Sequence, residues 1–316
     1  MSYPNRVVAM QNNKDFLSIA DLPINNVNYL IDIGCSSKTN PNQNILNKKN
    51  LVLLFEKPSL RTRVSFEIGI RQFGGECIYL NREDVGMNSR ENASDVAKVL
   101  DRWADGIIAR VFQHQTLLTL SENTTIPIIN ALSDQEHPCQ AIADLMTIKE
   151  HKGKLQGLKV VFVGDGNNVA TSLSIGCASV GADFILSCPP GYEIPSSLWL
   201  EAQKRSDVTG SQLEIINDPQ LAVLNADVIY TDVWVSMGQE DESKKRIEKF
   251  HQYQVNPELM RLANKNAIFM HDMPAHENEE ISIGMLCNPQ SVVFDQAENR
   301  LHAQKGILSE IFTKTN

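Results

Sequence analysis

Short apolar runs alternate with helical patterns along the whole chain, and this alternation constrains the fold more than any other feature. Each run has four to seven residues and is rich in Ile, Val and Leu, as in strands buried on both faces. Helical connections between successive strands are typical of parallel sheets. We predict strands in LVLLF (51–55), CIYL (77–80), GIIARV (106–111), IPIINAL (126–132), KVVFVG (159–164), DFILSC (183–188), DVIYTD (227–232), AIFMH (267–271) and SVVFD (291–295).

The length of the chain indicates two domains of this kind. Its 316 residues are about twice the length of a common domain. The polar segment HKGKLQGL (151–158) interrupts the apolar pattern and is the best boundary. We therefore expect an α/β fold of two doubly wound parallel-sheet domains, residues 1–150 and 151–316. The final helical pattern, about 298–312, is expected to pack back on the first domain.

Composition excludes several classes of partner and site. A net charge of −9 argues against a general nucleic-acid or anionic-membrane surface. No run approaches the ~18 apolar residues of a membrane span. The six cysteines are scattered without a CxxC pair, which predicts reduced thiols, a cytoplasmic location and no zinc site.

The segment SLRTR (59–63) follows the first predicted strand and leads into a helical pattern. Backbone N–H groups at a helix start favour a phosphate, and hydroxyl and guanidinium donors strengthen such a site. A capped helix with a solvated basic first turn would show the same residues, so this segment alone leaves both interpretations open.

Two further segments place polar residues after predicted strands. Arg110 ends one strand, where it can bind an anion or extend to water. His137 precedes Pro138, which is also typical of an ordinary helix start. Because His137, Cys139 and Gln140 lie close together at a corner of the same predicted sheet, we interpret them as part of one site.

Six segments in order resemble the ornithine carbamoyltransferases of the aspartate/ornithine carbamoyltransferase family. They are FEKPSLRTRVSFE (55–67), DRWADGIIAR (101–110), HPCQAIADLMT (137–147), GDGNNVATS (164–172), DVWVSMGQE (232–240) and AENRLHAQKGIL (297–308). The resemblance implies a carbamoyl-phosphate-binding first domain and an ornithine-binding second domain, with the active site in the cleft between them. It also implies a homotrimer or a multiple of trimers. It implies transfer of a carbamoyl group to ornithine, in arginine biosynthesis or catabolism, without a metal or other cofactor.

The resemblance also implies roles for individual residues. The carbamoyl phosphate site would comprise Ser59, Leu60, Arg61, Thr62, Arg110, His137, Gln140 and Arg300. The ornithine site would comprise Asn168, Asp232, Ser236, Met237, Asp272 and Met273. Arg61, Arg110, His137, Gln140 and Asp272 would be catalytic. An acid such as Asp232 suits an α-ammonium group, and donors near Ser236 and Met237 suit an α-carboxylate.

Four positions depart from the family pattern, and one of them is Asp84, near which many relatives carry glutamine. Leu60 stands where a hydroxyl residue is usual, and Asp272 and Met273 replace the Cys and Leu of a His-Cys-Leu-Pro motif. A carboxylate in place of the thiol would favour a charged ammonium, act as a base or hold a neighbouring arginine. These departures leave open a different amine acceptor, or a protein that binds carbamoyl phosphate without catalysis.

Two other classes of function match the sequence poorly. The turn GDGNN (164–168) has two of the three glycines of a dinucleotide-binding loop, but no acidic residue clearly follows the next strand. A metal site from His271, Asp272 and His276 would cross a proline loop and follows no strong template.

Overall fold

The computed structural model describes residues 14–40, 44–87, 90–235 and 240–313. The chain divides into two compact units, residues 1–146 with 299–316 and residues 147–298. Each unit is built on one parallel sheet, which confirms the predicted α/β fold class. No helix in the described ranges is long and apolar enough to cross a membrane.

The sheet of unit 1 has four strands in the order β2-β1-β3-β4. Its strands are β1 (Asn50–Phe55), β2 (Glu76–Asn81), β3 (Gly106–Arg110) and β4 (Ile128–Leu132). Its helical elements are η1 (Ile19–Asp21), α1 (Ile24–Thr39), η2 (Asn44–Leu46), α2 (Leu60–Gln72), α3 (Arg82–Val85), α4 (Ala93–Leu100) and α5 (His114–Glu122). The unit boundaries fall within α6 (Pro138–Lys152) and α12 (Val293–Thr313).

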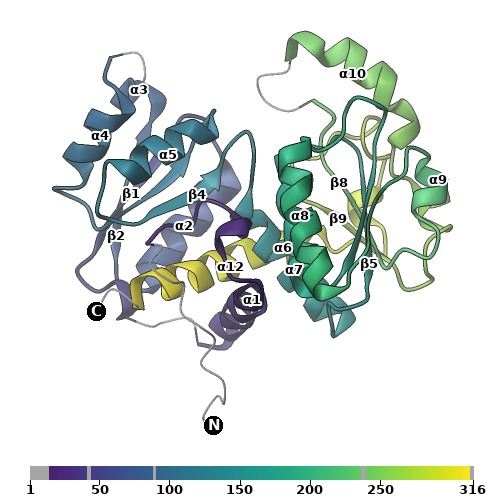
Figure 1. Cartoon of the computed structure of the whole chain (residues 1–316), viewed down its shortest axis with the longest axis horizontal. Coiled ribbons are helices and arrows are strands. Elements are labelled where there is room, and N and C mark those ends of the chain that lie inside the picture. Colours follow the sequence, from purple (N-terminus) through teal and green to yellow (C-terminus); the bar gives the residue numbers. More distant parts are fainter. Residues whose placement is uncertain (1–13, 41–43, 88–89, 236–239, 314–316) are drawn as a thin grey trace. The chain divides into compact units, whose positions relative to one another are not determined.

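Helices cover both faces of this sheet (Figure 1). Val52 and Leu54 of β1 pack in one apolar cluster with Val96 of α4 and Leu117 of α5. The alternate residue Leu51 lies beside Phe312 of α12, because both approach the bare Cα of Gly106. The period of two along β1 thus divides its side chains between two helical layers.

The sheet of unit 2 has five strands in the order β7-β6-β5-β8-β9. They are β5 (Lys159–Val163), β6 (Asp183–Ser187), β7 (Leu213–Ile215), β8 (Val228–Thr231) and β9 (Ile268–His271). Helices α7 and α8 lie on one side of it and α9 on the other (Figure 1). The helical elements are α7 (Asn168–Val180), α8 (Ser196–Thr209), α9 (Pro219–Ala222), η3 (Glu240–Glu242), α10 (Ser243–Phe250), η4 (His251–Tyr253), α11 (Pro257–Met260) and η5 (Met285–Cys287).

In unit 2, one predicted strand is not a strand, and one strand was not predicted. The run SVVFD (291–295) is not a strand, because only Ser291 bridges Phe269 and α12 begins at Val293. A short apolar run fits a buried helix start as well as a strand, and Val293 is fully buried in that helix start. The edge strand β7 was missed, since two of its three residues are exposed and it lacks a strong apolar pattern.

Candidate active site

The first turn of α2 lies at the carboxyl edge of the sheet in unit 1. Ser59 caps the helix, and its side chain accepts a hydrogen bond from the Thr62 N–H at 3.3 Å. Thr62 is buried, Arg61 is half-buried and Leu60 is 73% exposed. The turn therefore combines the N–H groups of a helix start, a positive dipole end and a guanidinium, which suits an anion.

Arg300 of α12 joins two distant segments of the predicted site. Its Nη2 donates to Thr62 Oγ1 at 2.9 Å, and its Nη1 donates to Gln140 Oε1. The Gln140 amide is oriented from its other end, because Nε2 donates to the buried Asp144 at 2.8 Å. Three predicted site residues, Thr62, Gln140 and Arg300, are thus in direct contact.

Arg110 and His137 lie at the same edge of the sheet. Arg110 is the last residue of β3 and pairs in register with Phe55, the last residue of β1. Its backbone oxygen accepts a hydrogen bond from Glu56 N–H at 2.8 Å, which holds the segment before Ser59 against β3. Both Arg110 and His137 are buried.

His137 is a neutral ring at physiological pH. Burial lowers the pKa of His137 well below its usual value of 6.5, and the charges of Arg300 and Arg110 lower it further. A neutral imidazole keeps one N–H for donation and adds no third cation beside the arginines. The ring therefore suits polarisation of a carbonyl oxygen better than binding of a phosphate.

Protonation of His137 is expected to destabilise the fold. Because the folded-state pKa is depressed, the stability contributed by the neutral ring is complete above pH 6.5 and is lost as the pH falls below it. Scanning calorimetry between pH 7.5 and about pH 5 should show a larger fall in Tm for the wild type than for a His137→Gln variant. Equal falls in Tm would contradict this account.

In unit 2, three polar segments follow the adjacent strands β5, β8 and β9. Asn167 caps α7 by accepting hydrogen bonds from the Val169 and Ala170 N–H groups. This fixes its amide so that Nδ2 donates to Asp232 Oδ2 at 2.7 Å. Asn168 was predicted in the site from sequence, whereas Asn167 was missed; an Asn just before a helical pattern is the N-cap signal that indicates it.

Position 166 requires glycine because there is no room for a side chain. A Cβ on Gly166 would lie 2.3 Å from the Ile194 nitrogen, and the Gly166 N–H donates to Tyr192 oxygen at 2.8 Å. The bare Cα thus serves close packing against the segment 192–194. A dinucleotide pyrophosphate is not needed to explain this residue.

A buried ion pair fixes the same turn. Arg246 of α10 donates to Asp165 at 2.9 Å and to the Trp234 oxygen at 3.0 Å. Both charged side chains are less than 10% exposed. The pair ties the segment after β8, which begins with Asp232, to the turn after β5.

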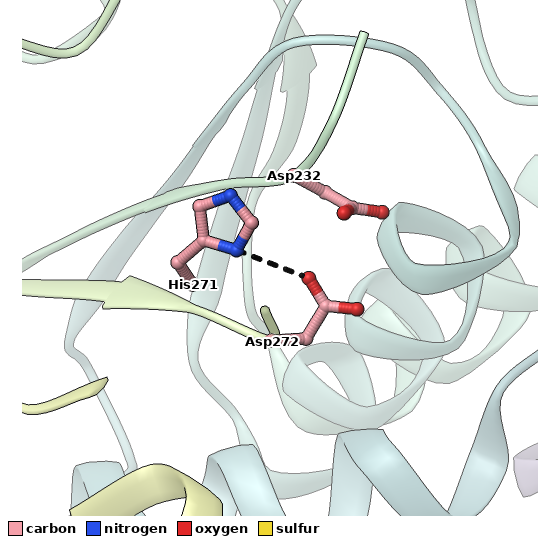
Figure 2. Close-up of side chains that lie close together, drawn as sticks. All are labelled: Asp232, His271 and Asp272. Carbon is pink, nitrogen blue, oxygen red and sulfur yellow. Dashed lines mark ion pairs between the residues drawn. The ribbon is translucent and has the colours of Figure 1, made fainter. Parts of the chain in front are cut away.

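Asp232, His271 and Asp272 converge at the ends of β8 and β9 (Figure 2). One carboxylate oxygen of each aspartate and one nitrogen of His271 lie within 4.8 Å of one another. His271 Nδ1 is 3.5 Å from Asp272 Oδ1, and Nε2 is 3.1 Å from Glu280. Burial raises the pKa of Asp232 well above its usual value, and the charge of Asp272 raises it further.

Both ring nitrogens of His271 have hydrogen-bond partners within unit 2. The Met273 N–H donates to Nδ1 at 2.9 Å, and Nε2 faces Glu280. Burial opposes a charged ring, although the carboxylates of Asp272 and Glu280 raise the pKa of His271 to about 9. The part of this rise that comes from Asp272 requires a proton on Nδ1, but in this geometry the Met273 N–H points at Nδ1. A nitrogen that accepts an N–H carries no proton, so the ring is neutral with its proton on Nε2.

The remaining predicted residues differ in what can be said of them. Ser236 and Met237 lie outside the described residues. Met273 packs, partly buried, against the apolar core of unit 2. His276 does not join His271 and Asp272 in one group; it lies with Glu279 and Glu280 and is half exposed.

Two family models match the chain. Residues 14–150 match the carbamoyl-P binding domain of aspartate/ornithine carbamoyltransferase, and residues 156–311 match its Asp/Orn binding domain. The chain belongs to the aspartate/ornithine carbamoyltransferase family. The resemblance inferred from the six segments is thereby confirmed.

Individual members of the family resemble the chain over most of its length. An ornithine carbamoyltransferase of Methanosphaera stadtmanae is 47% identical over 95% of this chain and 99% of its own. One of Thermococcus kodakarensis is 50% identical over 84% of both chains. The structure of ornithine carbamoyltransferase from Pyrococcus furiosus superposes with a TM-score of 0.92 at 44% identity, covering 96% of this chain and 97% of its own.

Proposed function

We propose that the protein transfers the carbamoyl group of carbamoyl phosphate to the side-chain amine of L-ornithine, giving L-citrulline and phosphate in arginine metabolism. The observation that carries the proposal is the buried contact of Arg300 with Thr62 and Gln140, beside neutral His137 and the start of α2. Thr62, Gln140 and His137 lie in the segment that matches a carbamoyl-P binding domain. Arg300 belongs to the same compact unit, although it comes from the segment that matches the Asp/Orn binding model.

The donor substrate would occupy unit 1. The phosphate would accept hydrogen bonds from the first turn of α2, from the hydroxyls of Ser59 and Thr62 and from Arg61 and Arg110. The carbamoyl oxygen would face His137, with Arg300 and Gln140 fixing the group's orientation. Because negative charge grows on this oxygen during attack, preorganised donors here lower the barrier.

The acceptor would occupy unit 2. Its α-ammonium group would pair with Asp232, which Asn167 and the Val233 N–H hold in place at 2.7 Å. Asn168, Ser236 and Met237 would bind the α-carboxylate, with Met273 nearby. The neutral side-chain amine attacks the carbamoyl carbon, the bond from carbon to the phosphate oxygen breaks, and phosphate can take the amine's proton.

We also propose a homotrimer in the cytoplasm. Val64 and Ile68 of α2 are 42% and 40% exposed, and Ile78 on the edge strand β2 is 60% exposed, so unit 1 presents apolar side chains for another copy. The six free cysteines suit a reducing compartment. Light scattering on the purified protein should give three times the chain mass of 35.3 kDa.

The identity of the acceptor is tested by comparing the rates of carbamoylation of different amines. We expect carbamoyl phosphate with ornithine to yield a ureido product far faster than lysine, 2,4-diaminobutyrate, putrescine or aspartate does. Ureido product and phosphate are both quantified. A faster reaction with another amine would identify that amine as the acceptor in place of ornithine. An absence of product with every acceptor would contradict the proposal.

A further inference from the structure

Asp272 places a second carboxylate beside that of Asp232. The proposed reaction does not require this second carboxylate. Asp272 is 13% exposed in its side chain, and Asp232 is buried. Their carboxylates lie on the same side of the strand ends, within 4.8 Å of each other (Figure 2). Two carboxylates this close and this dry hold one proton more readily than two negative charges.

The groups around Asp232 and Asp272 already have partners of their own, which leaves a shared proton to reduce the charge of the two carboxylates. Glu280 and His271 are hydrogen-bonded to each other, and the exposed His276 lies 3.9 Å from Glu280. On the side of β5, Asn167 is neutral and Asp165 is paired with Arg246. Because His271 Nδ1 accepts the Met273 N–H, the imidazole in this geometry does not supply Asp272 with a proton.

We propose that Asp232 and Asp272 share one proton while the amino-acid site is empty, and that the α-ammonium group of the acceptor expels this proton to solvent. The positive charge of the substrate then balances the negative charge of the two carboxylates that the proton balanced before. This inference rests on the proposed function for the identity of the ligand. Its consequence is that affinity for the amino acid rises with pH while the pair still holds its proton.

Proton release can be measured separately from catalysis. L-Norvaline has the α-ammonium and α-carboxylate of ornithine but no side-chain amine, so it cannot be carbamoylated and keeps its own charge near pH 7. Titration calorimetry of the protein with norvaline, in phosphate-containing solutions buffered with two compounds of different ionisation enthalpy, gives the protons released per site. We expect about one proton per site.

A variant and a control locate the proton. Asp272→Asn can donate its amide to Asp232 and leaves no pair to share a proton, so we expect norvaline binding without proton release and without pH dependence. Asp207→Asn, at an exposed aspartate of α8 in the same unit, should behave as the wild type. Release that persists in Asp272→Asn would place the proton elsewhere and overturn the inference.

The wild type alone also decides the question, even if the variant folds poorly. The Kd of norvaline should fall by up to tenfold per pH unit as pH rises toward the upper pKa of the pair. Binding with the same heat in both buffers and a flat Kd would overturn the inference while leaving the proposed function intact. If neither norvaline nor ornithine binds, both the proposed function and the inference fail.

Discussion

Replacement of Arg300 by methionine is expected to lower kcat/KM for carbamoyl phosphate by about 10³-fold, as for loss of a preorganised donor in an oxyanion site. Methionine fills much of the same volume but cannot donate to Thr62 or Gln140. Thr62 Oγ1 and Gln140 Oε1 would then lose their partner in a buried region. Steady-state assays at saturating ornithine measure the effect.

A buried cation in the same helix provides the matched control. Lys305 of α12 is fully buried, donates to Gln72 at 2.9 Å and lies over the Phe73 ring. Lys305→Met therefore also removes a buried charge from α12, but away from Thr62 and Gln140. We expect its kcat/KM to stay near that of the wild type, and an equal loss in both variants would show that Arg300 acts only through the fold.

Replacement of Asp232 by alanine is expected to lower kcat/KM for ornithine by about 10²-fold, because a buried ammonium loses its counter-ion. Alanine is chosen over asparagine for a structural reason. The Asn167 amide already donates to Asp232 Oδ2. An asparagine at position 232 with its NH₂ in place of Oδ2 would put two hydrogen-bond donors in contact with no acceptor between them. The measurement is the dependence of rate on ornithine concentration at saturating carbamoyl phosphate.

Binding of carbamoyl phosphate separates this effect from misfolding. Asp232→Ala should bind carbamoyl phosphate with the wild-type Kd in calorimetry, since the residue belongs to unit 2 and the donor residues to unit 1. Asp207→Ala, at an exposed aspartate, should keep the wild-type kcat/KM for ornithine. An Asp232→Ala variant that uses ornithine normally would remove Asp232 from the acceptor site.

The strands were predictable because burial on both faces leaves a clear apolar signature. LVLLF and KVVFV are central strands flanked by helical layers, so nearly every side chain in them must be apolar. The same signal fails at sheet edges and helix starts. It missed β7, which is half exposed, and it assigned SVVFD to a strand because Val292 and Val293 are buried in a helix start.

The contacts among the predicted site residues could not be derived from local sequence patterns. Thr62, Gln140 and Arg300 were assigned together only through resemblance to a family, because no local pattern connects residues separated by 160 and 238 positions. Topology brings them together by placing α12 beside α2. The carboxylate cluster of unit 2 likewise depends on β8 and β9 being neighbours in the sheet, which their consecutive order along the chain favours but does not establish.

The most direct test of the account follows the carbamoyl carbon itself. Carbamoyl phosphate labelled with ¹³C is incubated with ornithine and the purified protein, and the label is followed by nuclear magnetic resonance alongside phosphate release. The account predicts that the label appears in a ureido group on the side-chain nitrogen of ornithine, with one phosphate released for each. Phosphate release without labelled citrulline, or retention of all the label in carbamoyl phosphate, would contradict it.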